Sequence, residues 1–181
     1  ITIYGAGRLD AGVHALEQSA HFDCKTEIVQ LDKFLKAINY FLNKENIAIL
    51  KIKKRNNNFH ARFSAKMRIY KYIIINRLSG PVLEKNKGWH IIKKLDLELM
   101  KKGAKKLVGK KNFSTFRKSS CRAKSPIKTM KMVKIKSTKD KIEIEFRSQS
   151  FLQQQVRSMV GCLKYLGERK WSLKKFETIM K

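Results

Sequence analysis

Apolar residues along the chain recur at helical spacing in two early segments. Residues 32–42 carry them on one side and begin at Asp32, whose carboxylate is a candidate N-cap, so they predict a helix with one buried face. Residues 96–108 show the same spacing, begin at Asp96 and stop at Gly109, a residue type that commonly ends helices. Both segments are therefore predicted to be amphipathic helices.

A third apolar face at helical spacing runs through residues 156–166. After it, Ser172 is placed to cap a final helix that extends through Met180. The last part of the chain is therefore predicted to be helical.

Other segments alternate apolar and polar residues, or are rich in β-branched and aromatic ones, as strands are. Residues 1–4 read as the end of a strand that enters a turn at Gly5-Ala6-Gly7. Residues 47–54 alternate and predict a second strand, and residues 68–76 predict a third, central in its sheet and buried on both faces.

Two further alternating runs, residues 128–136 and 141–148, flank the turn-like residues 137–140 and predict a β-hairpin. Strands and helices thus alternate without a sustained parallel pattern. The order favours the α+β class, with helices on one face of a sheet. We expect two parts, residues 1–57 and 58–181, divided at the polar run that contains Asn57.

Charge is the strongest compositional signal. The 181 residues include 42 Lys and Arg against 14 Asp and Glu, a formal net charge of +28. A field of this sign attracts polyanions, above all nucleic acid, and an anionic membrane surface is a weaker alternative because the lysines form no amphipathic basic helix. A coding bias toward lysine would also raise the net charge, without any selection for a binding partner.

The chain shows no apolar run near the roughly 20 residues of a membrane span and no signal-peptide pattern at its start, so we expect a cytoplasmic protein. Its cysteines are widely spaced and read as reduced structural thiols: Cys24, Cys121 and Cys162. No Cys-x-x-Cys or His-x-x-x-His pair occurs. We therefore expect neither a metal site nor a redox site.

The glycines near the start fit two nucleotide motifs poorly. Gly5-Ala6-Gly7 begins like a dinucleotide fingerprint, but Asp10 stands at the third glycine position. A phosphate loop would need Lys and Ser or Thr where Val13-His14 stands. What remains is a carboxylate, Asp10, in a very basic chain. Local composition alone favours a turn-forming role for it beside Arg8, and chemistry is the alternative.

The whole stretch from Gly7 to Ala15, Gly-Arg-Leu-Asp-Ala-Gly-Val-His-Ala, resembles the catalytic loop of TruA-type tRNA pseudouridine synthases. Further segments match that family in order along nearly the whole chain: His21-Phe22, residues 59–65, Tyr70-x-Tyr72, residues 112–117, Phe151-Leu152, Val156-Arg157 and Gly161. The resemblance implies the pseudouridine synthase fold, with two ferredoxin-like halves and a largely antiparallel mixed sheet.

By this resemblance Asp10 is the catalytic carboxylate, Tyr70 the aromatic residue beside the target base, and Arg157 the cation near Asp10. The implied reaction isomerises uridine to pseudouridine in the anticodon stem-loop of tRNA, at positions 38 to 40. It requires no cofactor. Asp10 would act either as a nucleophile or as a base, since both roles need only a well-placed carboxylate.

RNA contacts are expected from the loop, from the following aromatic segment and from basic residues in the second part: Arg8, His14, Phe59, His60, Arg62, Lys66, Arg68 and Arg117. Residues 59–63 serve equally well as packing between the two parts. The family also implies a homodimer that holds tRNA.

The chain departs from the family pattern at Leu9, where Thr is usual, and at Gln153-Gln154, where a histidine pair is usual. We also expect a partial chain, without counterparts of the family's N-terminal strand and helix and its C-terminal strand. The competing hypothesis is a basic RNA-binding scaffold that has lost catalysis.

Overall fold

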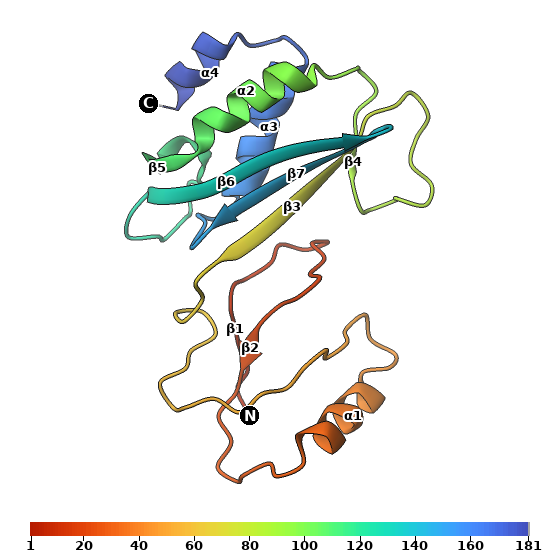
Figure 1. Cartoon of the computed structure of the whole chain (residues 1–181), viewed down its shortest axis with the longest axis vertical. Coiled ribbons are helices and arrows are strands. Elements are labelled where there is room, and N and C mark those ends of the chain that lie inside the picture. Colours follow the sequence, from red (N-terminus) through yellow and green to blue (C-terminus); the bar gives the residue numbers. More distant parts are fainter. Residues whose placement is uncertain (181) are drawn as a thin grey trace. The chain divides into compact units, whose positions relative to one another are not determined.

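The computed structural model describes residues 1–180. They divide into two compact units, with the boundary between Ala65 and Lys66. The boundary expected from the polar run at Asn57 lies inside the first unit, just before Phe59. Both units carry helices and strands (Figure 1), so the chain has the expected α+β composition.

The first unit contains a short antiparallel pair and one helix. Strand β1 (Tyr4–Gly5) pairs with β2 (Ala20–His21), and helix α1 spans Leu31–Phe41. The expected cap at Asp32 is wrong: Gln30 occupies the N-cap without a side-chain cap, and Asp32 lies within the first turn. There its carboxylate still interacts favourably with the helix dipole. The apolar face of α1 is only half-buried, and none of its residues is fully buried.

The strand expected at residues 47–54 is also wrong, because this segment has no regular structure. The side-chain amide of Asn39 in α1 satisfies the backbone of Ile49 instead. Its Nδ2 donates to the Ile49 carbonyl at 2.9 Å, and its Oδ1 accepts from the Ile49 N–H at 2.8 Å. Alternating apolar and polar residues indicate which side chains face the protein interior. A β-ladder forms only where a neighbouring strand supplies the hydrogen-bond partners.

The second unit is built on a five-stranded sheet with the order β4-β3-β7-β6-β5. The strands are β3 (Arg68–Ile75), β4 (Trp89–His90), β5 (Gly109–Asn112), β6 (Ile127–Thr138) and β7 (Lys141–Ser148). Only β3 and β4 are parallel, so the sheet is mixed and largely antiparallel. The predicted hairpin is confirmed as β6 and β7. The predicted burial on both faces is confirmed at Ile74 and Ile75.

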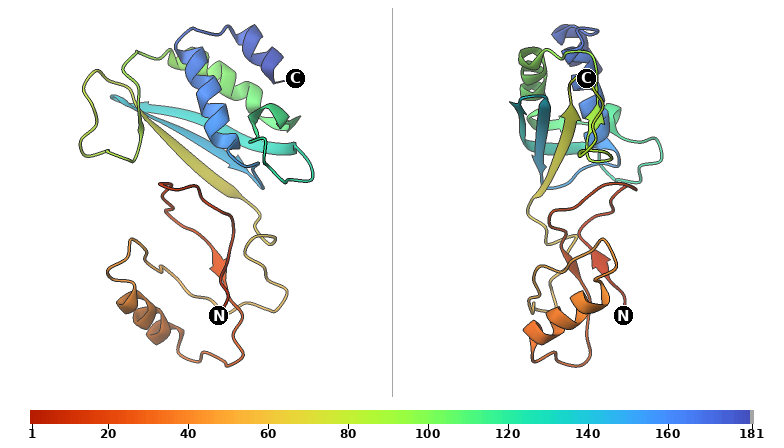
Figure 2. Two further views of the ribbon diagram at one scale, coloured as in Figure 1. Left: turned by 180° about the vertical axis from the view of Figure 1, so that it is seen from behind. Right: turned by 90° about the vertical axis from the view of Figure 1, so that its right-hand side faces the viewer.

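Three α-helices and one 3-10 turn complete the second unit: α2 (Leu97–Leu107), η1 (Ser114–Phe116), α3 (Gln155–Gly167) and α4 (Leu173–Ile179). Helix α3 crosses one face of the sheet, as the view from behind shows (Figure 2). Both predicted caps are confirmed: Asp96 Oδ1 accepts from the Leu99 N–H at 2.9 Å, and Ser172 Oγ from the Lys175 N–H at 3.2 Å. None of the helices among residues 1–180 is long and apolar enough to cross a membrane.

The core of the second unit lies between this sheet face and the helices. Its largest fully buried side chains include Phe113, Phe116, Phe146 and Phe176. Tyr70 and Tyr72, two residues apart on β3, point to the same face and pack against this core. The core therefore fixes the strand on which the predicted aromatic site residue stands.

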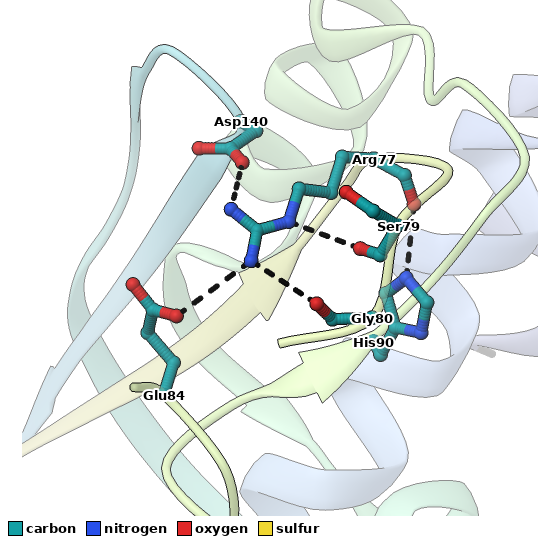
Figure 3. Close-up of polar contacts among 6 residues, drawn as sticks. All are labelled: Arg77, Ser79, Gly80, Glu84, His90 and Asp140. Carbon is teal, nitrogen blue, oxygen red and sulfur yellow. Dashed lines mark hydrogen bonds and ion pairs between the residues drawn. The ribbon is translucent and has the colours of Figure 1, made fainter. Parts of the chain in front are cut away.

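Arg77 holds the loop that follows β3 (Figure 3). Its guanidinium donates to Asp140 Oδ2 at 2.7 Å and to the carbonyls of Ser79 at 3.0 Å and Gly80 at 3.3 Å. The same guanidinium lies 3.8 Å from Glu84, and the Arg77 carbonyl lies 2.9 Å from His90 Nε2. The hydrogen bond from Arg77 lowers the pKa of Asp140. These contacts tie the loop to the β6–β7 turn.

Candidate active site

The predicted catalytic loop joins the two strands of the first unit. Tyr4 pairs with His21 and Gly5 with Ala20, and one further bond runs from the Ala6 N–H to the Ser19 carbonyl at 2.8 Å. The intervening residues, including Arg8, Asp10 and His14, therefore form a loop closed at its base by a short antiparallel ladder. Each of these three side chains is exposed.

Asp10 begins a tight turn within this loop. Its carbonyl accepts a hydrogen bond from the Val13 N–H at 3.1 Å, and Gly12 has a φ of +77°. Ala11 is not among the non-glycine residues with positive φ, so the geometry is that of a type II turn, which favours glycine at its third position. The turn thus uses the backbone carbonyl of Asp10, and the residue is exposed.

A second brace holds the start of the loop: Gln18 Nε2 donates to the Gly7 carbonyl at 2.8 Å. Leu9, which stands where the family usually has Thr, is 37 % exposed and is neither donor nor acceptor in the Ala6–Ser19, Asp10–Val13 and Gln18–Gly7 bonds. The loop therefore gets its shape from its base, from Gln18 and from the turn at Gly12.

Residues 59–64 pack against the base of the hairpin. The His60 ring lies 4.7 Å from that of His21 and 4.4 Å from that of Phe63, and Phe59 meets His21 edge-on at 6.0 Å. The Ala61 N–H donates to His21 Nδ1 at 3.2 Å. Phe59 and His60 thus pack against His21 within the first unit, while Phe63 is 75 % exposed and the exposed Arg62 lies beside it.

Tyr70 and Arg157 belong to the second unit. The Tyr70 ring meets Phe151 edge-on at 4.9 Å and is half-buried against the core. Arg157 lies in the first turn of α3 with an exposed side chain. Burial raises the pKa of the neighbouring Tyr72, and the positive charge of Arg157 acts in the opposite direction. Arg157 is therefore close enough to Tyr72 for its charge to act on the phenol.

The residues expected to contact RNA differ in exposure. Arg8, His14, Arg62, Lys66 and Arg117 are exposed, while Arg68, Phe59 and His60 are half-buried. Arg68 donates to the Gln149 carbonyl, a contact that positions the beginning of β3 beside the end of β7. The exposed members present charge that a polyanion could reach.

The glutamines that stand for the family's histidine pair occupy the entry to α3. Gln154 is the N-cap with a φ of +60°, and the Gln153 carbonyl accepts from the Lys118 N–H at 3.0 Å. Both side chains are exposed. Their backbone therefore sets the start of the helix that carries Arg157.

The described residues contain no group of three or more His, Cys, Asp or Glu that could hold a metal ion. The three cysteines are free. Hydrogen bonds from the backbone of Ala123 and Gln153 lower the pKa of Cys121, and burial raises that of Cys162.

Sequence reasoning did not single out two residues that the structure places beside predicted ones. His21 Nδ1 accepts a hydrogen bond from the Ala61 N–H, and the His21 ring stacks on Tyr4 with ring centroids 5.1 Å apart. Tyr72 lies near Arg157. The signals were present, since both residues fall in the matched segments, but nothing in a linear motif shows which side chains meet.

Comparison with known proteins supports the resemblance over nearly the whole chain. A family model described as tRNA pseudouridine synthase matches residues 104–181. The tRNA pseudouridine synthase A of Pelagibacter ubique is 71% identical over 181 residues, which are 100% of this chain and 74% of that protein. The proteins of that name from Maricaulis maris and Parvibaculum lavamentivorans are 40% and 42% identical over 98% of this chain, and the matches cover 71% and 72% of those proteins. The chain belongs to the tRNA pseudouridine synthase A family.

Proposed function

We propose that this chain isomerises uridine to pseudouridine in the anticodon stem-loop of tRNA, with Asp10 as the catalytic carboxylate. The observation that carries the proposal is the exposed Asp10 in a loop closed by β1 and β2, within a chain of this family. The hydrogen bond from the Val13 N–H to the Asp10 carbonyl fixes the turn on which this exposed residue stands.

The reaction exchanges one glycosidic bond for another. The bond between uracil N1 and ribose C1′ breaks, the base rotates, and a bond forms between C5 and C1′. The proton on C5 leaves and N1 gains one, so atoms and electrons balance without a cofactor. Asp10 attacks the ribose or removes a proton from it, and either role requires close and rigid placement.

Tyr70 is proposed as the wall against which the flipped uracil lies, because an extruded base gains stability by contact with an aromatic side chain. Its edge-on contact with Phe151 and its place against the core keep the ring in one orientation. Arg157 is proposed as the cation of the same site, the role that the family resemblance assigns to it.

The proposed partner is tRNA, and its basic contacts would bind phosphates. The proposed RNA-binding residues are Arg8, His14, Phe59, His60, Arg62, Lys66, Arg68 and Arg117. The net charge of +28 supports this, because cationic side chains release counterions when they neutralise phosphates. A homodimer and a cytoplasmic location complete the proposal and rest on the family alone.

Release of tritium from tRNA labelled at C5 of uridine tests the function directly, because only the exchange of N1 for C5 frees that hydrogen. The purified chain should release tritium from a tRNA transcript and none from a matched transcript whose anticodon-arm uridines are replaced by cytidine. Folded protein that binds tRNA but releases no tritium would instead support the RNA-binding scaffold.

A further inference from the structure

We propose that His21 is a positioning residue for the isomerisation. Its imidazole acts as a clamp that joins residues 59–64 to the β1–β2 hairpin, and this hairpin carries the Asp10 loop. This inference rests on the proposed function. It assigns to His21 no contact with the substrate, only control over the base of the loop.

The clamp is a hydrogen bond between segments far apart in sequence. The Ala61 N–H donates to His21 Nδ1 at 3.2 Å, and Ala61 is 3 % exposed. Water has little access to this residue, so an Ala61 N–H without its acceptor would lose a partner that solvent does not readily replace. Because Nδ1 accepts, the neutral imidazole carries its proton on Nε2.

Aromatic contacts fix the direction in which Nδ1 points. The Tyr4 ring, directly opposite His21 in the ladder, stacks on the imidazole with centroids 5.1 Å apart and planes 24° from parallel. His60 at 4.7 Å and Phe59 at 6.0 Å meet it edge-on. A ring held by three neighbours has little freedom to turn away from the Ala61 N–H.

The clamp can influence Asp10 because the ladder that carries its loop is short. Strands β1 and β2 are two residues long each, and the bonds from Ala6 to Ser19 and from Gln18 to Gly7 extend the pairing into the loop. His21 is the last residue of β2, so the clamp acts on the ladder itself. A shift of about 1 Å in a reacting group can slow catalysis roughly a hundredfold.

Three substitutions separate positioning from general stability. His21→Asn places an amide oxygen near the position of Nδ1 and removes the ring. His21→Phe keeps a ring on Tyr4 and removes the acceptor. His21→Gln places its acceptor further out, nearer the position of Nε2.

Under single-turnover conditions with saturating enzyme, we expect His21→Phe and His21→Gln to slow tritium release by about tenfold or more. The dissociation constant for tRNA should change by less than about twofold, since no phosphate contact is altered. His21→Asn should recover most of the rate. A purely structural role predicts the opposite order, because Phe preserves more packing than Asn. Equal rates for the parent and a folded His21→Phe variant, or an Asn variant as slow as Phe, would overturn the proposal.

Amide hydrogen exchange in the unsubstituted chain covers the case in which the variants do not fold. We expect the Ala61 amide to exchange as slowly as that of Ala6, which is bonded to the Ser19 carbonyl. Fast exchange at Ala61 would refute the clamp. Parent protein that releases no tritium would refute the proposed function itself, whereas the exchange experiment would still report on the clamp.

Discussion

At the scale of single residues, the motif around Asp10 indicates a family and a set of candidate site residues, but it does not show which side chains meet. The turn at Gly12 agrees with the local sequence, because glycine readily adopts the positive φ that the third position of a type II turn requires. The bond from Ala61 to His21 joins positions 40 apart in sequence. No local pattern predicts such a contact, so the role of His21 emerges only from the fold.

The effect of the Arg157 charge should be measurable as a shift in the pKa of Tyr72. Burial raises the pKa of this tyrosine, and Arg157 lowers it by favouring the tyrosinate. Arg157→Gln removes the favourable charge, so the pKa of Tyr72 should rise further. NMR titration of ring-labelled tyrosine would follow it, with Arg169→Gln as a control because Arg169 pairs with Asp96 instead. An unchanged or lower pKa in Arg157→Gln would show that the two side chains do not interact.

At the scale of elements, most predictions from local signals succeeded, although the cap expected at Asp32 was wrong. Asp96 and Ser172 cap α2 and α4 through bonds that span three residues, and the β6–β7 hairpin needs only two adjacent strands and a turn. The strand prediction failed at residues 47–54, where the side chain of Asn39 bonds the Ile49 N–H and carbonyl that a neighbouring strand would otherwise pair with. The short strands β4 and β5 were also missed, because they exist only through their pairing with β3 and β6.

Two glycines in adjacent helices should respond oppositely to alanine. A Cβ on Gly103 in α2 would lie 2.3 Å from Leu166 Cδ1 and 3.1 Å from Leu163 Cδ2, and both leucines are fully buried. Gly103→Ala should therefore lower the free energy of unfolding by about 1–3 kcal/mol. A Cβ on Gly161 in α3 would meet no atom within 4 Å apart from its chain neighbours and its own helix backbone, so Gly161→Ala should raise the free energy of unfolding by about 0.5–1 kcal/mol through helix propensity.

Urea denaturation of both variants beside the parent provides the measurement. Each variant serves as the other's control, since the two substitutions add the same methyl group to a helix interior. A stabilised Gly103→Ala variant would mean that α2 and α3 do not pack as closely as this structure shows.

At the scale of the whole molecule, composition predicted an affinity for polyanions but not where a polyanion binds. The 32 lysines are distributed along most of the sequence, and coding bias explains such a distribution as well as selection does. The division into two units at Ala65 and Lys66 depends on which segments pack together. Composition carries no information about that packing.

Salt dependence distinguishes a functional charge from a compositional one. If six to ten basic residues neutralise tRNA phosphates, affinity should fall by roughly 10³ to 10⁵ between about 50 and 200 mM salt. Filter binding or fluorescence anisotropy with a tRNA transcript would give the slope, and removing Arg117 should reduce that slope by about one unit. A flat response would show that the positive charge does not serve RNA binding.

The most direct test of the central claim compares Asp10→Asn with Asp23→Asn in the tritium-release assay. Both substitutions remove one exposed carboxylate from the first unit with almost no change in shape. Asp10→Asn should slow release by about a thousandfold or more while tRNA affinity stays near that of the parent, and Asp23→Asn should leave both unchanged. An Asp10→Asn variant that releases tritium at the rate of the parent would contradict the assignment of Asp10 as the catalytic carboxylate.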